Sequence, residues 1–213
     1  MKHPVSLLST FVLALLLSAC ASDGGQAPAQ APAPGVKTEE KAAVNPQGDA
    51  AAALTISKVT ATVEAIDRAT RMVTIVGPEG RSVIVQAGEE VRNLDQVQVG
   101  DKVMVEYYEG LVAELVTAGT SPKEVSLTDA VVRAEPGQRP AGAAGAAVTA
   151  TVVIESVDPV RNVVRFTGPL GKTRTVKVMK PEFRAMLKNL KPGDQVALTY
   201  FEALAVNVQP ANK

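Results

Sequence analysis

Four kinds of residue in this sequence have side chains that could do chemistry. There is one cysteine, Cys20, whose thiol could be acylated or oxidised. Two aromatic–acidic triplets, Tyr107-Tyr108-Glu109 and Tyr200-Phe201-Glu202, place rings beside carboxylates, and an exposed ring of this kind can contact a sugar or a peptide. Several aspartates follow or precede turn residues, where paired carboxylates could in principle act as an acid and a base. The question is which elements position these groups, and whether any of them meet.

The residue types that the sequence lacks exclude more chemistry than those it has support. His3 and Cys20 are the only histidine and the only cysteine of the 213 residues. If residues 1–19 are removed as expected below, no imidazole remains to pair with a serine or cysteine nucleophile. Zinc and copper sites would have to do without histidine and free thiols, which is unfavourable. The methionines Met72, Met104, Met179 and Met186 are dispersed, so a thioether copper site is not expected either. We therefore expect neither an enzyme nor a cofactor or metal site.

The first twenty residues have the pattern of an export signal. Lys2 supplies a positive charge, and the apolar stretch from Leu7 to Leu17 is too short to span a bilayer as a stable helix. The stretch ends in Leu17-Ser18-Ala19-Cys20. This tetrapeptide resembles the lipobox of bacterial lipoproteins, in which the cysteine is alkylated with diacylglycerol and becomes the new N-terminus. The resemblance implies a signal peptide over residues 1–19, lipidation of Cys20 and a membrane as partner.

The same resemblance gives an expected location in the bacterial cell envelope. Ala21, rather than Asp, follows the cysteine, and similarity to Gram-negative lipoprotein sorting then implies an outer-membrane anchor facing the periplasm. Without Lys2, 21 basic residues stand against 22 acidic ones, a side-chain charge of about −1. Because nucleic-acid binding needs clustered basic residues, no nucleic-acid partner is expected.

Residues 20–53 are rich in Ala, Pro and Gly. Val36 and Val44 are the only branched apolar residues of its Ala21–Ala53 portion, so little surface can be buried to offset the entropy of ordering. We expect a disordered tether here.

Two similar segments follow the tether, which indicates an internal repeat. The matching stretches are Val59–Val63 with Val148–Val152, Gly77–Gly80 with Gly168–Gly171, Val99–Val103 with Pro192–Val196, and Tyr107–Leu111 with Tyr200–Leu204. They occur in one order in both segments. Asp67 and Asp158 also correspond, each at a predicted hairpin turn.

Each repeat reads as β-structure. In the first, alternating Val, Ile, Thr and Tyr predict strands, listed as Ile56–Ile66, Arg71–Val76, Arg81–Gln86, Lys102–Tyr108 and Leu111–Val116. A helical turn is expected over Val91–Val97, and a one-sided helix over Pro181–Leu190. Five strands with a helix before the fourth are similar to a small OB-like barrel. With their repeated Gly-Pro-x-Gly turns and Gly-Asp entries to a strand, residues 55–208 resemble bacterial exported proteins with small tandem β-barrel domains of uncharacterised function.

We accordingly predict a mainly β protein with two tandem five-stranded OB-like barrels. The expected segments are the signal peptide (1–19), the tether (20–53), the first barrel (54–121), a partly structured linker (122–146) and the second barrel (147–213). An open meander, or one sheet shared between the two units, are the alternatives. Within the linker, Lys123–Ala134 is expected to add a strand or a short helix to the first unit.

The candidate ligand-binding residues are Tyr108, Glu109, Phe201 and Glu202. Adjacent residues of a strand point to opposite faces, so Tyr107 and Tyr200 are expected to face the core while Tyr108 and Phe201 are exposed. The structural alternative is a hairpin end with cross-strand aromatic packing and a solubilising Glu. Asp67, Asp158, Asp101 and Asp194 are interpreted as turn residues that accept backbone hydrogen bonds.

These features together predict a non-enzymatic lipoprotein that presents two β-modules from a membrane for binding or scaffolding. An envelope protein, peptidoglycan or another polysaccharide is the expected partner. The alternative is a small-ligand or metal-binding module that uses the repeated aromatic and acidic residues. A carboxylate-based envelope hydrolase is a third possibility.

Overall fold

A computed structural model of the chain describes residues 36–116 and 125–211, which belong to one unit. The expected signal peptide, Cys20 and the beginning of the tether lie outside the described residues, as does the predicted boundary at residues 121 and 122. Among the described residues the protein is mainly β, as predicted, with ten strands in one sheet. None of the helices in these ranges is long and apolar enough to cross a membrane.

The elements of the two repeats follow each other in the same order. The first repeat contains β1 (Lys37–Val44), β2 (Ala50–Asp67), β3 (Met72–Val76), β4 (Ser82–Gln86), the 3₁₀ turn η1 (Leu94–Gln96) and β5 (Lys102–Val116). The second contains β6 (Val125–Arg133), β7 (Ala141–Asp158), β8 (Val163–Thr167), β9 (Thr173–Lys177), the helix α2 (Pro181–Leu187) and β10 (Gln195–Gln209). The duplication seen in the sequence is therefore a duplication of six elements, with β1 and β6 as counterparts.

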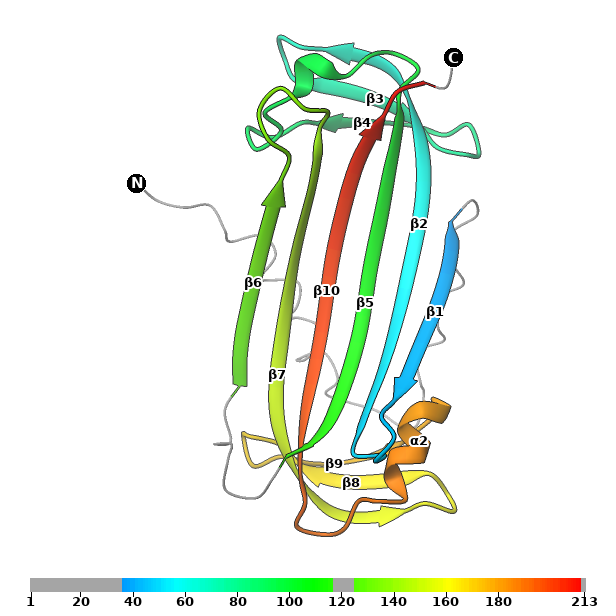
Figure 1. Ribbon diagram of the computed structural model, residues 1–213, viewed down its shortest axis with the longest axis vertical. Coiled ribbons are helices and arrows are strands. Elements are labelled where there is room, and N and C mark those ends of the chain that lie inside the picture. The colour runs from blue at the N-terminus through cyan, green and yellow to red at the C-terminus, as the bar shows by residue number, and fades with distance from the viewer. Residues whose placement is uncertain (1–35, 117–124, 212–213) are drawn as a thin grey trace. The chain divides into compact units, whose positions relative to one another are not determined.

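All ten strands form one antiparallel sheet (Figure 1). The strand order is β4-β3-β2-β5-β10-β7-β8-β9, with β1 paired to β2 and β6 paired to β7. β2 and β7, each of 18 residues, are long enough to serve two partners in succession. The first part of β2 pairs with β1 and its last part with β3, and β7 divides in the same way between β6 and β8.

Two separate OB-like barrels are not confirmed, because β5 and β10 join the repeats. These strands pair over their full length, from Lys102 opposite Gln209 to Val116 opposite Gln195. The alternative of one sheet shared between the units is the one that the structure shows.

The structure contradicts the predicted disorder of the tether where it describes it, and the predicted start of the second repeat at residue 147. Residues 37–44 form β1 and residues 50–53 begin β2, both within the segment for which the sequence predicts disorder. Residues 141–146 of the predicted linker begin β7. Small side chains are used here for close approach: a Cβ atom on Gly145 would lie 2.9 Å from the Cβ of Ala203. Lys123–Ala134 does supply a strand, β6, rather than a helix, but β6 pairs with β7 of the second repeat, so its expected addition to the first unit is wrong.

Hydrophobic cores lie at the two ends of the long strands. One contains Val63, Leu94, Val97 and Val208, with β3 and η1 packed over β2 and β10. The other contains Ala51, Ala113, Val152, Ile154, Val164, Met186, Leu187 and Val196, with β8 and α2 packed over the opposite ends of the strands. Each core uses residues of both repeats, so neither repeat is closed by itself.

The expected separation of the strands Lys102–Tyr108 and Leu111–Val116 is wrong, and so is the alternative of a hairpin end, because β5 continues through this stretch. Gly110, between the two expected strands, lies opposite Phe201 of β10. A Cβ atom at Gly110 would lie 2.2 Å from the Phe201 ring. The glycine therefore makes room for a ring that packs on the neighbouring backbone, a known use of glycine within strands.

The aspartates assigned to turns have that role. Asp67 accepts the backbone N–H of Ala69 at 2.9 Å, and its counterpart Asp158 accepts that of Arg161 at 2.9 Å. Asp101 and Asp194 each accept the N–H of the residue three positions before them. The predicted helical turn and helix are confirmed as η1 and α2, both shorter than expected.

Candidate functional site

The two repeats meet on a local two-fold axis in the middle of the sheet. Glu109 of β5 lies directly opposite Glu202 of β10, and these two residues are equivalent in the repeat. On either side, Tyr107 lies opposite Leu204, and Leu111 opposite Tyr200. β5 and β10 are equivalent strands of the two repeats, and they pair antiparallel around the equivalent residues Glu109 and Glu202. The same patch of each repeat therefore contacts its counterpart, as in the isologous interface of a symmetric dimer, but within one chain.

These six residues point to one face of the sheet. We call this the core-side face, because residues of the same alternation, such as Ala113 on β5 and Val196 on β10, belong to an end core. The mid-sheet site is defined as Tyr107, Glu109, Leu111, Tyr200, Glu202 and Leu204. None of the six belongs to either core, and Leu111 and Leu204 remain 37% and 46% exposed. Apolar surface therefore stays accessible around the two carboxylates.

The carboxylates of the mid-sheet site share the hydroxyl group of Tyr200. Its Oη lies 2.5 Å from Oε1 of Glu202 and 3.1 Å from Oε1 of Glu109. A phenol carries one proton, so it can donate to only one of them at a time. Among the described residues, neither glutamate forms an ion pair with a lysine or arginine within 4.0 Å. The site thus holds negative charge in an otherwise apolar stretch.

Burial and this charge both act on the tyrosines. Burial, followed by a hydrogen bond to Glu202 and the charges of both glutamates, raises the pKa of Tyr107 to about 12. The same causes raise the pKa of Tyr200 further above its ordinary value. Both phenols are therefore neutral hydrogen-bond donors at neutral pH.

The other two predicted residues lie on the opposite face, which we call the outer face. Tyr108 donates a hydrogen bond to Glu106, whose carboxylate is 3.3 Å from Nζ of Lys58. Phe201 packs against Gly110. Both rings thus already have partners within the sheet.

The structure does not bring the four predicted residues together. Glu109 and Glu202 meet, but the rings beside them are Tyr107 and Tyr200, rather than Tyr108 and Phe201. The prediction grouped sequence neighbours although strand alternation separates them. Applied to the glutamates as well as the rings, the same alternation would have placed Tyr107 with Glu109 and Tyr200 with Glu202.

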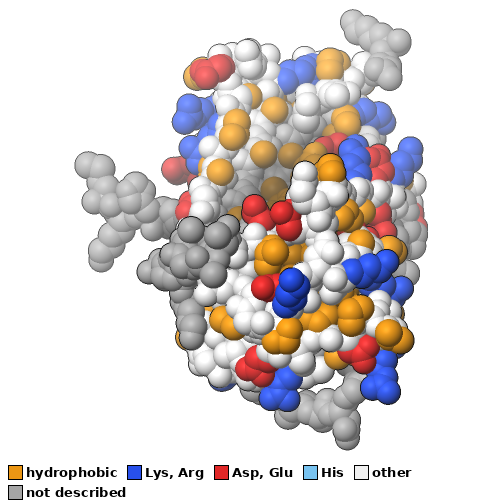
Figure 2. Space-filling model, turned by 60° about the horizontal axis from the view of Figure 1, so that its bottom comes forward, with side chains coloured by type: hydrophobic (Ala, Val, Ile, Leu, Met, Phe, Trp, Pro, Cys, Tyr) orange, Lys and Arg blue, Asp and Glu red, His pale blue; other side chains and the backbone are white. Residues whose placement is uncertain are grey.

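Seen from the end that carries β8, β9 and α2, the surface is hollowed, and hydrophobic side chains line the hollow beside acidic ones (Figure 2).

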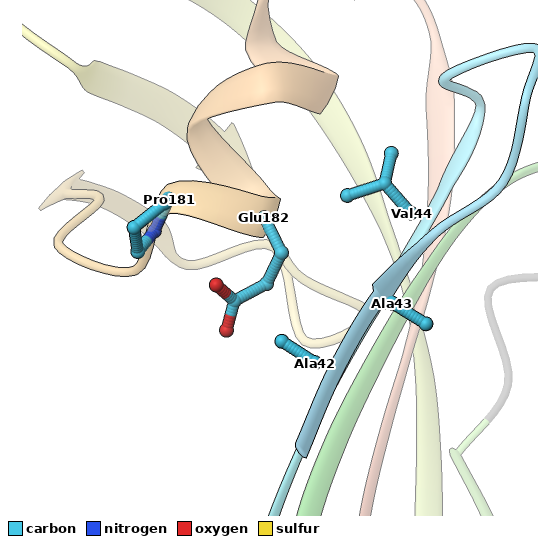
Figure 3. A pocket seen from close by; sticks show the side chains of 5 residues that line it. All are labelled: Ala42, Ala43, Val44, Pro181 and Glu182. Carbon is cyan, nitrogen blue, oxygen red and sulfur yellow. The ribbon is translucent and has the colours of Figure 1, made fainter. Parts of the chain in front are cut away.

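A separate, shallow pocket of about 360 Å³ lies between the end of β1 and the start of α2. It is lined by Ala42, Ala43, Val44, Pro181 and Glu182 (Figure 3). One carboxylate and four short apolar side chains offer a ligand few specific contacts, so this pocket is a weaker candidate than the mid-sheet site.

Comparison with known proteins adds no further assignment. No family model, curated protein or solved structure matches this chain. Within the described residues, no group of three or more histidine, cysteine, aspartate or glutamate side chains is placed to hold a metal ion. The function of the chain is therefore inferred from its sequence motifs and from the geometry of its sheet.

Proposed function

We propose that this chain is a non-enzymatic lipoprotein of the bacterial cell envelope that presents its sheet as a binding or scaffolding module. The lipobox-like residues Leu17-Ser18-Ala19-Cys20 support the anchor. The observation that carries the binding role is the mid-sheet site, where two carboxylates and two phenols lie among exposed leucines. The anchor holds the module at a membrane, and the mid-sheet site contacts the partner.

The proposed location is the outer membrane, with the module facing the periplasm. Ala21 after the cysteine supports this location through the resemblance to Gram-negative lipoproteins. The proposed partner is an envelope protein or a polysaccharide such as peptidoglycan. A face that combines apolar side chains with a few convergent polar groups suits either, since rings and leucines supply contact area and carboxylates fix orientation.

We also propose that each end of the sheet is related to a small OB-like module. The order of three strands, a helical element and a further strand in each repeat supports this. In this proposal, β5 and β10 are the strands through which two such modules became one sheet.

A second candidate function is the binding of a small ligand with a cationic group. The observation that favours it is the approach of Glu109 and Glu202 to the same Tyr200 hydroxyl. An ammonium or guanidinium group would neutralise this pair and could lie against the tyrosine rings. Such a ligand would raise the melting temperature of the protein, and more so the more tightly it binds. If the partner is instead an envelope protein or polysaccharide, no small cation should raise the melting temperature in this way.

Site-specific photo-crosslinking in intact cells tests the main proposal. A photoreactive residue at Leu204, which is 46% exposed in the mid-sheet site, is compared with one at Val160, which is 92% exposed in the β7–β8 turn. We expect a defined adduct from position 204 that is lost when Glu109 and Glu202 are both replaced by Lys, and none from position 160. Equal adducts from both positions, or an adduct that persists in the charge-reversed variant, would contradict a role of this site.

A further inference from the structure

Among the described residues, the edge strand β6 has a partner strand on one side only and carries few of the charged side chains that discourage further pairing. β6 pairs with β7 and, within the described ranges, with no other strand (Figure 1). All nine of its residues are exposed. Its large apolar side chains are Val125, Leu127, Val131 and Val132, which are 58%, 60%, 58% and 66% exposed. A long apolar edge strand is a template for pairing with another strand.

The counterpart of β6 in the first repeat is protected in the usual way. β1 carries four charged residues among eight, Lys37, Glu39, Glu40 and Lys41. Charged side chains, lysine above all, discourage pairing at a free edge. β6 carries only Asp129 and Arg133. The two equivalent edges therefore differ in the feature that decides whether a strand is added.

The backbone groups that β6 offers can be assigned from its pairing with β7. The N–H of Ala134 donates to the carbonyl oxygen of Ala141 at 2.8 Å, in register with the β6–β7 ladder. Since hydrogen-bonded residues alternate along an antiparallel strand, the even-numbered residues of β6 bond to β7. The odd-numbered residues Asp129, Val131 and Arg133 therefore direct their N–H and C=O groups to the open edge.

We propose that this edge pairs with β6 of a second copy of the chain. In the proposed register, Val131 lies opposite Val131 of the second copy, and both use their free backbone groups. Asp129 of each chain then lies opposite Arg133 of the other, so two cross-strand ion pairs form symmetrically. This inference goes beyond the proposed binding function and does not depend on it.

The order of charges along β6 favours a second copy of the chain as the pairing partner and also favours one pairing register. Asp129, Val131 and Arg133 read as negative, apolar and positive, which is self-complementary when the strand is reversed. A register centred on Asp129 would instead place two aspartates opposite each other, which is destabilising. A second copy therefore satisfies the edge with backbone bonds, apolar contact and opposite charges at once.

Cysteine crosslinking of the full chain tests the register. In a Cys20→Ser background, Val131→Cys supplies the sole thiol. Hydrogen-bonded residues opposite each other have Cα atoms about 5.5 Å apart, within the range for a disulfide, so oxidation should give a linked dimer. Leu127→Cys is the matched control, because it is on the same face and 60% against 58% exposed. In the proposed register, however, the two copies of residue 127 lie about 27 Å apart.

Charge reversal tests the interface without new covalent bonds. Asp129→Arg and Arg133→Asp should each weaken dimerisation about tenfold in analytical ultracentrifugation. A mixture of the two variants should form a heterodimer, because every cross-strand pair is then again of opposite charge. The double variant with both exchanges should dimerise like the original chain. Circular dichroism of each variant shows that folding is retained.

Three results would overturn the proposal. The first is that the original chain stays monomeric at micromolar concentration and that the Val131→Cys variant forms no disulfide-linked dimer. This result would count against the proposal even if another partner covers the edge. The second is equal crosslinking through positions 131 and 127, which indicates random collision. The third is growth into larger assemblies, which indicates that β6 pairs with a different edge of the next molecule.

Discussion

Glu109 and Glu202 lie directly opposite each other across β5 and β10, at the point where the two repeats are related by a local two-fold axis. Like charges in this position oppose strand pairing. The hydroxyl group of Tyr200 offsets part of this by lying 3.1 Å from one carboxylate and 2.5 Å from the other. An arrangement that does not favour the sheet by itself, and that is repeated about a symmetry axis, is a natural place for a binding role.

The tyrosines of the site should show this charge in an alkaline titration. The chain has three tyrosines and no tryptophan, so phenolate absorbance can be followed cleanly. We expect a transition with a pKa of about 12 from Tyr107, which Tyr107→Phe removes. Glu202→Gln should move it towards 10.0, the ordinary value, since a hydrogen bond to Glu202 contributes to the shift.

The same shift predicts how stability depends on pH. The folded pKa of Tyr107 lies above the unfolded one, so its contribution is complete below pH 10.0 and is lost as the pH rises towards about 12. The free energy of unfolding of Tyr107→Phe should fall less over that interval than that of the original chain. If the free energies of unfolding of the two proteins fall equally steeply over this pH interval, the phenol of Tyr107 is not buried beside negative charge.

Gly110 and Phe201 should be energetically coupled. Gly110→Ala brings a Cβ atom within 2.2 Å of the ring, and we expect a loss of about 1 to 3 kcal/mol as the ring is displaced. In a Phe201→Ala background the same change should be neutral or stabilising, because glycine within a strand is unfavourable. A double-mutant cycle by urea unfolding measures the coupling, and additive effects would contradict the packing described.

Asp101 and Arg139 tie the β6–β7 connection to the first repeat. Nη1 of Arg139 lies 2.6 Å from Oδ2 of Asp101, which is 2% exposed. Burial by itself would raise the pKa of Asp101, but hydrogen bonds from the Gln98 N–H and from Arg139 outweigh it, so the pKa lies below its ordinary value. This stability is present at neutral pH and is lost as the pH falls through the folded pKa.

Asp101→Asn should therefore lower the free energy of unfolding by about 2 kcal/mol at neutral pH. The difference from the original chain should shrink on acidification below pH 3.8, the ordinary pKa of the group. Asp194→Asn is the control, because Asp194 caps the equivalent turn but forms no ion pair with a described residue. Equal losses for the two variants would mean that the arginine adds nothing.

Cys20→Ser tests the anchor alone. We expect fatty-acid labelling of the original protein and none of the variant, which should also keep its signal peptide. Each buried methylene contributes about 0.8 kcal/mol, so two or three acyl chains hold a protein firmly at a membrane. Membrane retention of the original protein without any lipid label would contradict lipidation.

Much of this fold can be predicted because its signals are local. The repeat and its turn residues fix the order of strands, and Asp67 and Asp158 mark equivalent hairpins. The pairing of β5 with β10, which joins the repeats, depends instead on contacts between residues far apart in the sequence. Gly110 lies where the sequence predicts a break between two strands, and only the ring of Phe201, far along the chain, shows that the glycine serves close packing.

The same limit applies to the alanine-rich segments and to the site. Residues 50–53 and 141–146 have low β-propensity, yet they pair with neighbouring strands, and a side chain at Gly145 would meet Ala203. Glu109 and Glu202 were found as candidates because they repeat, but their pairing depends on the register of β5 and β10. Which tyrosines accompany them follows from strand alternation, a rule that was available in the sequence.

Carboxylate footprinting tests the mid-sheet site as a binding surface most directly. Glu109 is exposed in the mid-sheet site, and the side chain of Asp95, in η1, is 88% exposed. Both should react with a carbodiimide and an amine in the purified full chain. In intact envelopes we predict that modification of Glu109 falls several-fold while that of Asp95 is unchanged. Equal modification of Glu109 in the envelope and in the purified protein would contradict the claim that this site is covered by a partner.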